Sequence, residues 1–224
     1  MLRLGKVHIV LVAAAALAVV TPARGGIITF DFDTGTPTLV TGQNVPFDQM
    51  SGGVTAHFSS PGGAVFSVQT DGSTGFTMSQ FFGQYLNDNN PNRNFLDIQF
   101  TQQLSSITLT FATADFQQVE IPTTIRLTAY ENSTGTPAVG SATAHGTYAS
   151  DTMPMGTLSF DSGGQPFNLV EIGIPAGNPL GATDFLVDNI TVTLIPEPGS
   201  MALLGVGLLS LARLVRRRRT ARSP

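Results

Sequence analysis

Apolar and polar residues alternate along most of this 224-residue chain, in short runs separated by clusters of Gly, Pro, Asn, Asp and Ser. A period of two is typical of strands that bury one face, and the 3.6-residue period of an amphipathic helix is almost absent. The clearest runs lie at residues 28–33, 54–58, 65–68, 95–100, 106–112, 124–130, 139–148, 155–160, 167–174 and 185–194. The pattern therefore predicts an all-β body.

Turn signals follow one another about every ten to fifteen residues, which favours two packed antiparallel sheets, a β-sandwich of jelly-roll type. A closed barrel is the alternative. Residues 54–58 and 65–68 flank the segment Ser-Ser-Pro-Gly-Gly and are expected to form a hairpin. His57 should then lie on the solvent face of its strand. Residues 95–100 and 106–112 are expected as two separate strands.

The last expected strand, residues 185–194, changes its alternation partway along. Apolar residues occupy odd positions up to Val187 and even positions from Ile190 onward. A slip of one residue moves every side chain to the opposite face, so an extra residue must be absorbed at Asp188-Asn189. The sequence predicts a β-bulge there.

The two ends of the chain differ from the body. Arg3 and Lys6 precede an apolar stretch, residues 7–20, and Thr-Pro-Ala-Arg-Gly-Gly follows it. A basic start, an apolar centre and a small-residue exit are the three parts of a secretory signal peptide, here residues 1–25. The alternative, a first transmembrane helix, is disfavoured because the run is short. Residues 26–195 then form one domain of comfortable size.

The C-terminal tail, residues 196–224, combines a rigid turn, an apolar run and a basic cluster. Each proline of Pro196-Glu197-Pro198 fixes φ and removes a backbone donor, so this unit separates the body from the apolar run. The run is shorter than the roughly 20 residues that cross a bilayer, but Arg213 can snorkel and lengthen it. A short transmembrane helix is expected. The run is followed by four arginines that would stay in the cytoplasm, Arg216, Arg217, Arg218 and Arg219.

This order of Pro-Glu-Pro, apolar segment and arginine cluster resembles the PEP-CTERM sorting tail of exported bacterial proteins. The tripeptide alone carries little weight, but its position directly before the apolar run makes the combination specific. The resemblance implies recognition and cleavage by exosortase, a membrane protease-transpeptidase of Gram-negative cells that secrete exopolysaccharide. An ordinary tail anchor is the alternative. The resemblance covers only the tail, so it indicates where the protein goes and little about its body.

Charge and cysteine content exclude several classes of function. Of the 11 Lys and Arg residues only Arg93 and Arg126 lie in the body, against 14 of the 15 acidic residues, which gives residues 26–195 a charge of 2 − 14 = −12. Nucleic-acid binding is disfavoured because no basic surface can neutralise phosphates. The absence of cysteine excludes disulfides and thiolate zinc sites. An acidic body suits divalent cations or a hydrated extracellular matrix.

Residues 185–192, Phe-Leu-Val-Asp-Asn-Ile-Thr-Val, resemble the closing strand of many carbohydrate-binding jelly rolls. The resemblance implies that the first and last strands are neighbours, with a structural calcium near the point where they meet. Asp31 and Asp33 lie on one face of the first expected strand, and Asp188 or Asp184 could approach them. Oxygen ligands in an acidic, cysteine-free domain suit calcium. The alternative is that these aspartates cap turns and hydrate strand ends.

The most polar stretch of the body, residues 87–94, is expected to form a long surface loop. It could also contact a sugar or a cation, with Tyr85, Phe81 and Phe82 as stacking groups. Tryptophan, the usual platform for sugar rings, is absent. That absence weakens a lectin assignment, although tyrosine can serve the same purpose.

Catalytic signals are weak. No nucleophile motif, phosphate loop or paired-histidine metal site occurs. Asp115 and Glu120 could form the carboxylate pair of a glycosidase, but solvation of strand ends explains them better. The sequence therefore predicts a non-enzymatic, exported surface or extracellular-matrix protein that is sorted by exosortase and anchored transiently in the inner membrane. The alternative is a carbohydrate-binding β-sandwich module that acts on exopolysaccharide.

Overall fold

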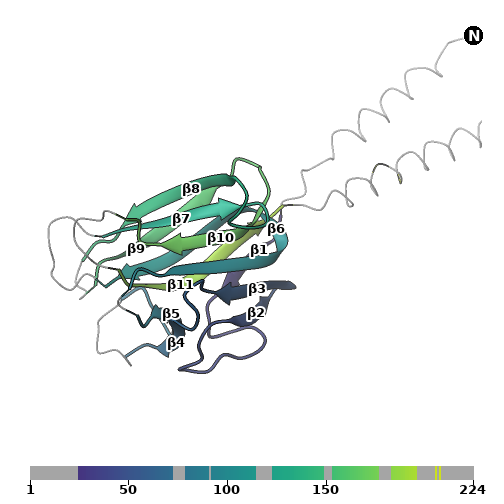
Figure 1. The fold of residues 1–224 in the computed structure, drawn as a ribbon. Coiled ribbons are helices and arrows are strands. Elements are labelled where there is room, and N and C mark those ends of the chain that lie inside the picture. The colour runs from purple at the N-terminus through teal and green to yellow at the C-terminus, as the bar shows by residue number, and fades with distance from the viewer. Residues whose placement is uncertain are drawn as a thin grey trace, which may run out of the picture. The chain divides into compact units, whose positions relative to one another are not determined.

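The computed structural model describes residues 25–72, 79–90, 92–114, 123–148, 153–176 and 183–195, together with Gly205 and Gly207. Gly26–Ile195 is one compact unit, drawn in Figure 1. Its strands are β1 (Ile27–Phe30), β2 (Phe47–Ser51), β3 (Val54–Ser59), β4 (Phe66–Thr70), β5 (Gln84–Asp88), β6 (Phe95–Thr113), β7 (Thr124–Tyr130), β8 (Ala138–His145), β9 (Met155–Asp161), β10 (Phe167–Gly173) and β11 (Phe185–Leu194). Every pairing between them is antiparallel. The predicted all-β antiparallel class is confirmed.

Strand β6 connects the two layers of the body. Its first half pairs with β3 and β10, and its second half pairs with β9 and β11. One layer therefore contains β2, β3, the first half of β6, β10, β7 and β8. The other contains β4, β5, β11, β1, the second half of β6 and β9. Among the named strands the hydrogen-bonded order runs from β4 to β8 without closing into a barrel.

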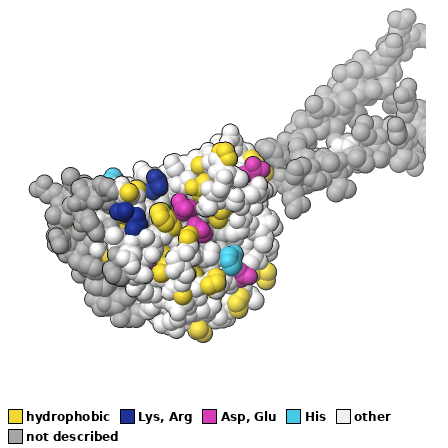
Figure 2. All heavy atoms as spheres, in the orientation of Figure 1, with side chains coloured by type: hydrophobic (Ala, Val, Ile, Leu, Met, Phe, Trp, Pro, Cys, Tyr) yellow, Lys and Arg dark blue, Asp and Glu magenta, His cyan; other side chains and the backbone are white. Residues whose placement is uncertain are grey.

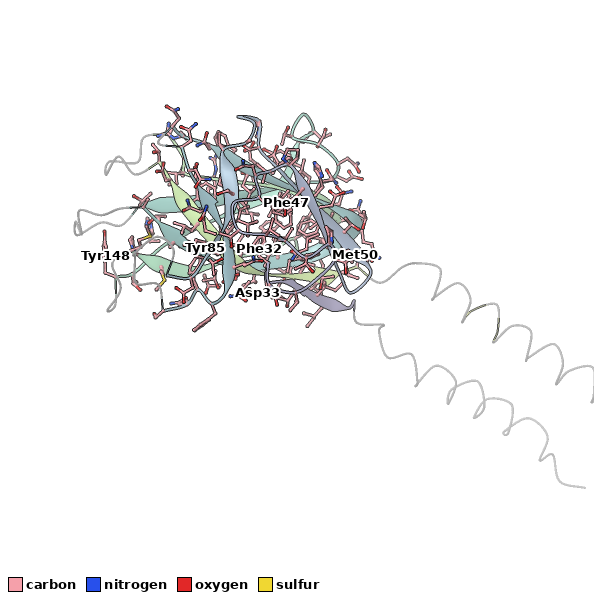
Figure 3. All side chains as sticks on the ribbon, turned by 90° about the horizontal axis from the view of Figure 1, so that it is seen from below. Phe32, Asp33, Phe47, Met50, Tyr85 and Tyr148 are labelled. Carbon is pink, nitrogen blue, oxygen red and sulfur yellow. The ribbon has the colours of Figure 1, made fainter. Side chains whose placement is uncertain are left out.

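Aromatic side chains fill the space between the layers. The ring of Phe30 on β1 lies 5.9 Å from that of Phe100 on β6, and Phe160 on β9 lies 5.4 Å from Phe167 on β10. Figure 3, a view from below, labels Phe32 and Phe47, whose rings both pack on Phe58 at 5.3 and 5.1 Å. Buried aromatic rings of this size contribute much of the apolar area that stabilises a cysteine-free domain. The side chains on the outward faces of the strands are not part of this core.

The expected hairpin of residues 54–58 and 65–68 is wrong. β3 pairs with β2 and β6, whereas β4 pairs with β5 in the other layer. The partly exposed Ser-Ser-Pro-Gly-Gly segment carries the chain from one layer to the other, with a turn closed by the Gly63 N–H donating to the Ser60 carbonyl at 3.0 Å. Turn residues mark a change of direction, but they do not say whether the strands on either side pair with each other.

Two expected strand boundaries also differ. Residues 95–100 and 106–112 belong to one 19-residue strand, because the segment between them contains no Gly or Pro and Leu104 within it is fully buried. β1 ends at Phe30, so Asp31 and Asp33 do not lie on a strand face as expected. Phe32 has a φ of 60°, and this left-handed conformation ends the strand while turning its ring into the core.

The predicted bulge in the last strand is confirmed. The register of β11 against β6 shifts between Asp188 and Thr191, and Asn189 has a φ of 51°. Asn tolerates the left-handed region better than most residues, so it suits the extra position. The expected pairing of the first and last strands is confirmed as well, since β1 pairs with β11 from Ile27 opposite Thr193 to Phe30 opposite Ile190.

Candidate functional site

The outward face of β6, β10 and β7 carries the largest group of charged and aromatic side chains on one described sheet surface. Figure 2 shows blue, magenta and cyan side chains over this layer, on a surface that is otherwise mostly uncharged. We call these residues the outer platform: Phe95, Asp97 and Gln99 on β6, Glu171 on β10, and Arg126 and Tyr130 on β7. Alternation explains the placement, because Leu96, Ile98 and Phe100 are buried on the opposite face.

Strand register arranges the outer platform in rows. Asp97 lies opposite Glu171, which in turn lies opposite Thr128. In the next row Gln99 and Tyr130 flank Leu169, and in the row on the other side Phe95 and Arg126 flank Gly173. Residues directly opposite each other in antiparallel strands have neighbouring side chains. The two acids therefore lie between one aromatic ring on β6 and another on β7.

Asp97 is the most perturbed group of the outer platform. Burial raises its pKa to about 6, and the nearby charge of Glu171 adds to the rise. Its Oδ1 atom is buried and has no hydrogen-bond partner. Burial also raises the pKa of Tyr130, Glu171 raises it further, and Arg126 opposes the rise. The four side chains thus share one electrostatic environment.

Gly173 allows the Phe95 ring to lie directly on the sheet. A Cβ atom at this position would lie 2.5 Å from Cδ1 of Phe95, so any larger residue would displace the ring. Phe95 and Tyr130 are both only partly buried, and each keeps some of its ring surface accessible. An exposed ring beside hydrogen-bonding groups is the arrangement with which proteins stack sugar rings or other flat apolar faces.

His57 extends the polar surface onto β3, where it lies opposite Gln99. Its Nδ1 lies 2.6 Å from Oδ1 of Asp48 on β2, and its side chain is 48% exposed. The prediction that His57 lies on the solvent face is confirmed. This exposed pair contributes little to stability, because water screens it.

The three aspartates predicted as calcium ligands approach one another near the end of β1, in the layer that contains β1 and β11. Asp188 is fully buried; burial raises its pKa to about 7, and the charges of Asp33 and Asp31 add to the rise. Asp184, the fourth candidate, instead influences Asp88. The structure thus brings Asp31, Asp33 and Asp188 within electrostatic reach, although only Asp188 lies on a strand.

Backbone and side-chain donors already serve each of these carboxylates. Asp31 accepts hydrogen bonds from the Thr34 N–H and hydroxyl, both at 2.8 Å. Asp33 Oδ1 accepts from the Gln84 N–H at 2.8 Å, and Asp188 accepts from the backbone N–H groups of Asn189 and Phe82. These contacts agree with the alternative interpretation from the sequence, in which the aspartates cap turns.

No group of three or more His, Asp or Glu side chains that could hold a metal ion occurs among the described residues. The three aspartates lie near one another without converging on a common point. Calcium binding by Asp31, Asp33 and Asp188 therefore stays a prediction, and it requires at least one carboxylate to turn away from its present donor. Burial of a charged group with like-charged neighbours is the physical reason for keeping the prediction.

Gly83 was missed by sequence reasoning and is central to this region. It has a φ of 70°, and a Cβ atom there would lie 2.1 Å from Oδ2 of Asp33. The turn of Phe82, Gly83 and Gln84 directs one N–H group at Asp188 and another at Asp33. Only a glycine lets this turn approach the Asp33 carboxylate so closely. No local sequence signal shows which carboxylate such a turn will contact.

The polar stretch 87–94 is shorter as a loop than expected, because its first two residues belong to β5. Asp88 and Asn94 are buried, and Nδ2 of Asn94 donates to Oδ1 of Asp88 at 2.9 Å. Burial raises the pKa of Asp88 to about 7, the hydrogen bond from the Asn90 N–H lowers it, and the charge of Asp184 raises it again. This arrangement stabilises the loop from within.

The proposed stacking role of two nearby aromatic residues is wrong. Phe81 and Tyr85 are fully buried, and their rings pack edge to face at 5.5 Å in a small second core. Alternation did not reveal this because β5 is short and buried on both faces. Phe82 alone remains available, with 68% of its surface exposed.

Several predictions concern residues outside the described ranges. These include the signal peptide, the glycosidase candidates Asp115 and Glu120, the Pro196-Glu197-Pro198 unit, and the arginines Arg216, Arg217, Arg218 and Arg219. In the tail only Gly205 and Gly207 are described, both with helical backbone. Within the part of the chain that the structure describes, no helix has the length and apolar character needed to cross a membrane.

The family comparison identifies the tail. Residues 194–219 match the PEP-CTERM protein-sorting motif, which confirms the resemblance drawn from the sequence. The match begins at Leu194, the last residue of β11, so the sorting signal comes directly after the folded body. The chain therefore carries the signal of a secreted protein that is sorted to the cell envelope. No curated protein matches the chain.

Solved structures give distant matches to the body. The K2 cleaved adhesin domain of Lys-gingipain shares 12% identity, with 75% of this chain and 100% of that chain covered and a TM-score of 0.47. A family 29 carbohydrate-binding module complexed with cellulohexaose shares 12% identity, with coverage of 76% and 92% and a TM-score of 0.36. The family 11 module of the Clostridium thermocellum cellulase Lic26A-Cel5E shares 10%, with coverage of 77% and 97% and a TM-score of 0.31.

Proposed function

We propose that this chain is a non-enzymatic surface or extracellular-matrix protein that is exported through its signal peptide and sorted by exosortase. The observation that carries the proposal is the PEP-CTERM match at residues 194–219, placed directly after the last strand of the body. In this proposal residues 1–25 direct export, residues 26–195 form a jelly-roll sandwich outside the cell, and residues 196–224 hold the protein transiently in the inner membrane. Processing then occurs near Pro196-Glu197-Pro198.

The Glu197→Gln variant tests the proposal in a Gram-negative host that contains an exosortase. We expect the wild type to lose its tail and the variant to keep it, because the acidic centre between two prolines is the part that exosortase recognises. Mass spectrometry of the mature C-terminus and cell fractionation measure both outcomes. Glu131→Gln, an exposed position in the body, is the control and should be processed normally. Intact wild-type protein in the cytoplasm would show that the proposal is wrong.

The outer platform favours a second function, the binding of polysaccharide by the exported body. Two partly exposed rings, Phe95 and Tyr130, flank hydrogen-bonding groups on an open sheet face. Aromatic faces supply apolar contact to a sugar ring, and neighbouring carboxylates and amides accept or donate hydrogen bonds to its hydroxyls. Sorting would then deliver a binding module to the exopolysaccharide layer.

Binding of the purified protein to a glycan array tests this second function. We expect the wild type to bind at least one polysaccharide and the Phe95→Ala and Tyr130→Ala variants to lose about tenfold in affinity or more. Phe82→Ala, which removes an exposed ring away from the outer platform, is the matched control. Turnover of labelled polysaccharide by the same protein would contradict the non-enzymatic assignment.

A further inference from the structure

The acid pair at the centre of the outer platform is unfavourable in the free protein. Asp97 and Glu171 lie directly opposite each other on neighbouring strands, and like charges in such positions destabilise a sheet. The Oδ1 atom of Asp97 is buried with no hydrogen-bond partner. A buried polar atom left unpaired destabilises the fold. A ligand that brings positive charge to the accessible side of the pair would relieve the repulsion between the two carboxylates.

The surroundings of the pair do not supply that charge. The positive side chain of the outer platform, Arg126, lies opposite Gly173 in the adjacent row, and its effect is on Tyr130. The rise in the pKa of Asp97 comes from burial and from Glu171. Residues 26–195 carry a charge of −12 by sequence, so the field around the platform attracts cations and repels anions over a longer range.

We propose that the outer platform selects glycans that carry protonated amino groups and rejects glycans that carry uronic acids. This inference rests on the proposed glycan-binding function and names the class of glycan. An ammonium group on a sugar ring donates charge-assisted hydrogen bonds to the accessible oxygens of the two carboxylates. The Phe95 and Tyr130 rows lie ~14 Å apart along the strands and ~10 Å across them, so several sugar residues would span the two rings.

Titration calorimetry of the full chain in detergent tests the inference at neutral pH in the presence of a chelator. The probes are oligomers of glucosamine, N-acetylglucosamine and galacturonic acid of equal length. We expect the glucosamine oligomer to bind about tenfold more tightly than the N-acetylated one, and the galacturonate oligomer not to bind. The Asp97→Asn/Glu171→Gln variant should lose that tenfold preference and keep its affinity for the neutral oligomer.

Two controls separate charge selection from folding. Asp71→Asn removes an exposed acid in a turn away from the platform and should retain the preference for glucosamine. Glu171→Gln alone removes one charge of the pair and leaves Asp97 in place, so a reduced preference in this variant supports the inference even if the double variant is unstable. A preference that survives the single variant and the folded double variant overturns it.

The failure of the inference can be distinguished from the failure of glycan binding. Equal affinity for all three oligomers, or binding of galacturonate once calcium replaces the chelator, overturns charge selection and leaves glycan binding intact. Absence of binding to every oligomer and to the glycan array overturns both. Binding that is unaffected by Phe95→Ala and Tyr130→Ala overturns the outer platform as the site.

Discussion

Two groups of carboxylates in this molecule have the same chemistry and different surroundings. Asp31, Asp33 and Asp188 lie near the end of β1 and each accepts hydrogen bonds from backbone N–H groups or a hydroxyl. Asp97 lies on a sheet face opposite a second acid, with one oxygen unpaired. The first group stabilises turns of the fold. The second has no such structural role, and this difference is why we place a ligand site on the outer platform.

The largest expected effect comes from obstructing the close approach of Gly83 to the Asp33 carboxylate. We expect Gly83→Ala to destabilise the protein by about 4 kcal/mol, since the new Cβ displaces the Asp33 carboxylate from the Gln84 N–H and strains a positive-φ position. Gly72→Ala is the matched control, because Gly72 has a φ of 78° but nothing within 4 Å of its Cβ position. It should cost only about 1 to 2 kcal/mol.

Chemical denaturation of both variants measures the difference. Equal losses of unfolding free energy in Gly83→Ala and Gly72→Ala would show that backbone strain alone matters. The Asp33 carboxylate would then have no structural role at this turn, and the contrast between the two groups of carboxylates would disappear.

The relation between sequence and structure is different for the two groups. Alternation along β6 correctly places Leu96 and Ile98 in the core, and the parity change in β11 locates the bulge at Asp188-Asn189. The sequence did not reveal the contact between Asp33 and Gly83, because the two residues are 50 positions apart and no local pattern encodes which turn meets which carboxylate. Long-range contacts of this kind depend on the folded topology.

The outer platform could have been predicted in part. The alternation that buries Leu96 and Ile98 also places Phe95 and Asp97 on the outward face, so an outward acid beside an aromatic ring was available as a signal. The position of Glu171 opposite Asp97 was not available, since it requires the pairing of β10 with β6. No local pattern in residues 95–99 or 167–173 encodes which two strands will pair or in which register.

Calcium binding is the next test of the comparison, and it concerns the first group of carboxylates. If Asp31, Asp33 and Asp188 hold calcium, saturating calcium should raise the melting temperature of the wild type by about 5 to 10 °C over its value in chelator. Asp188→Asn should remove most of that shift, whereas Asp97→Asn should keep it. A wild-type melting temperature that is the same in calcium and in chelator eliminates the metal and leaves turn capping as the role of these residues.

The smallest expected effect concerns the pH dependence that Asp97 confers. Its pKa is about 6 in the folded protein and 3.8 as the ordinary value, so between these values the folded state retains a proton that the unfolded state has lost. The contribution of Asp97 to the free energy of unfolding should therefore fall as the pH rises from about 4 to about 6, and stay level above that range. Because Asp97 is partly exposed, solvent screening reduces the loss to about 1 kcal/mol.

Denaturant unfolding of the wild type and of Asp97→Asn across this pH range measures the loss, with Asp71→Asn as the control. A pH-dependent loss that is equal in all three proteins would mean that the acid pair is not strained, and the reason for placing a positively charged ligand on the outer platform would be removed.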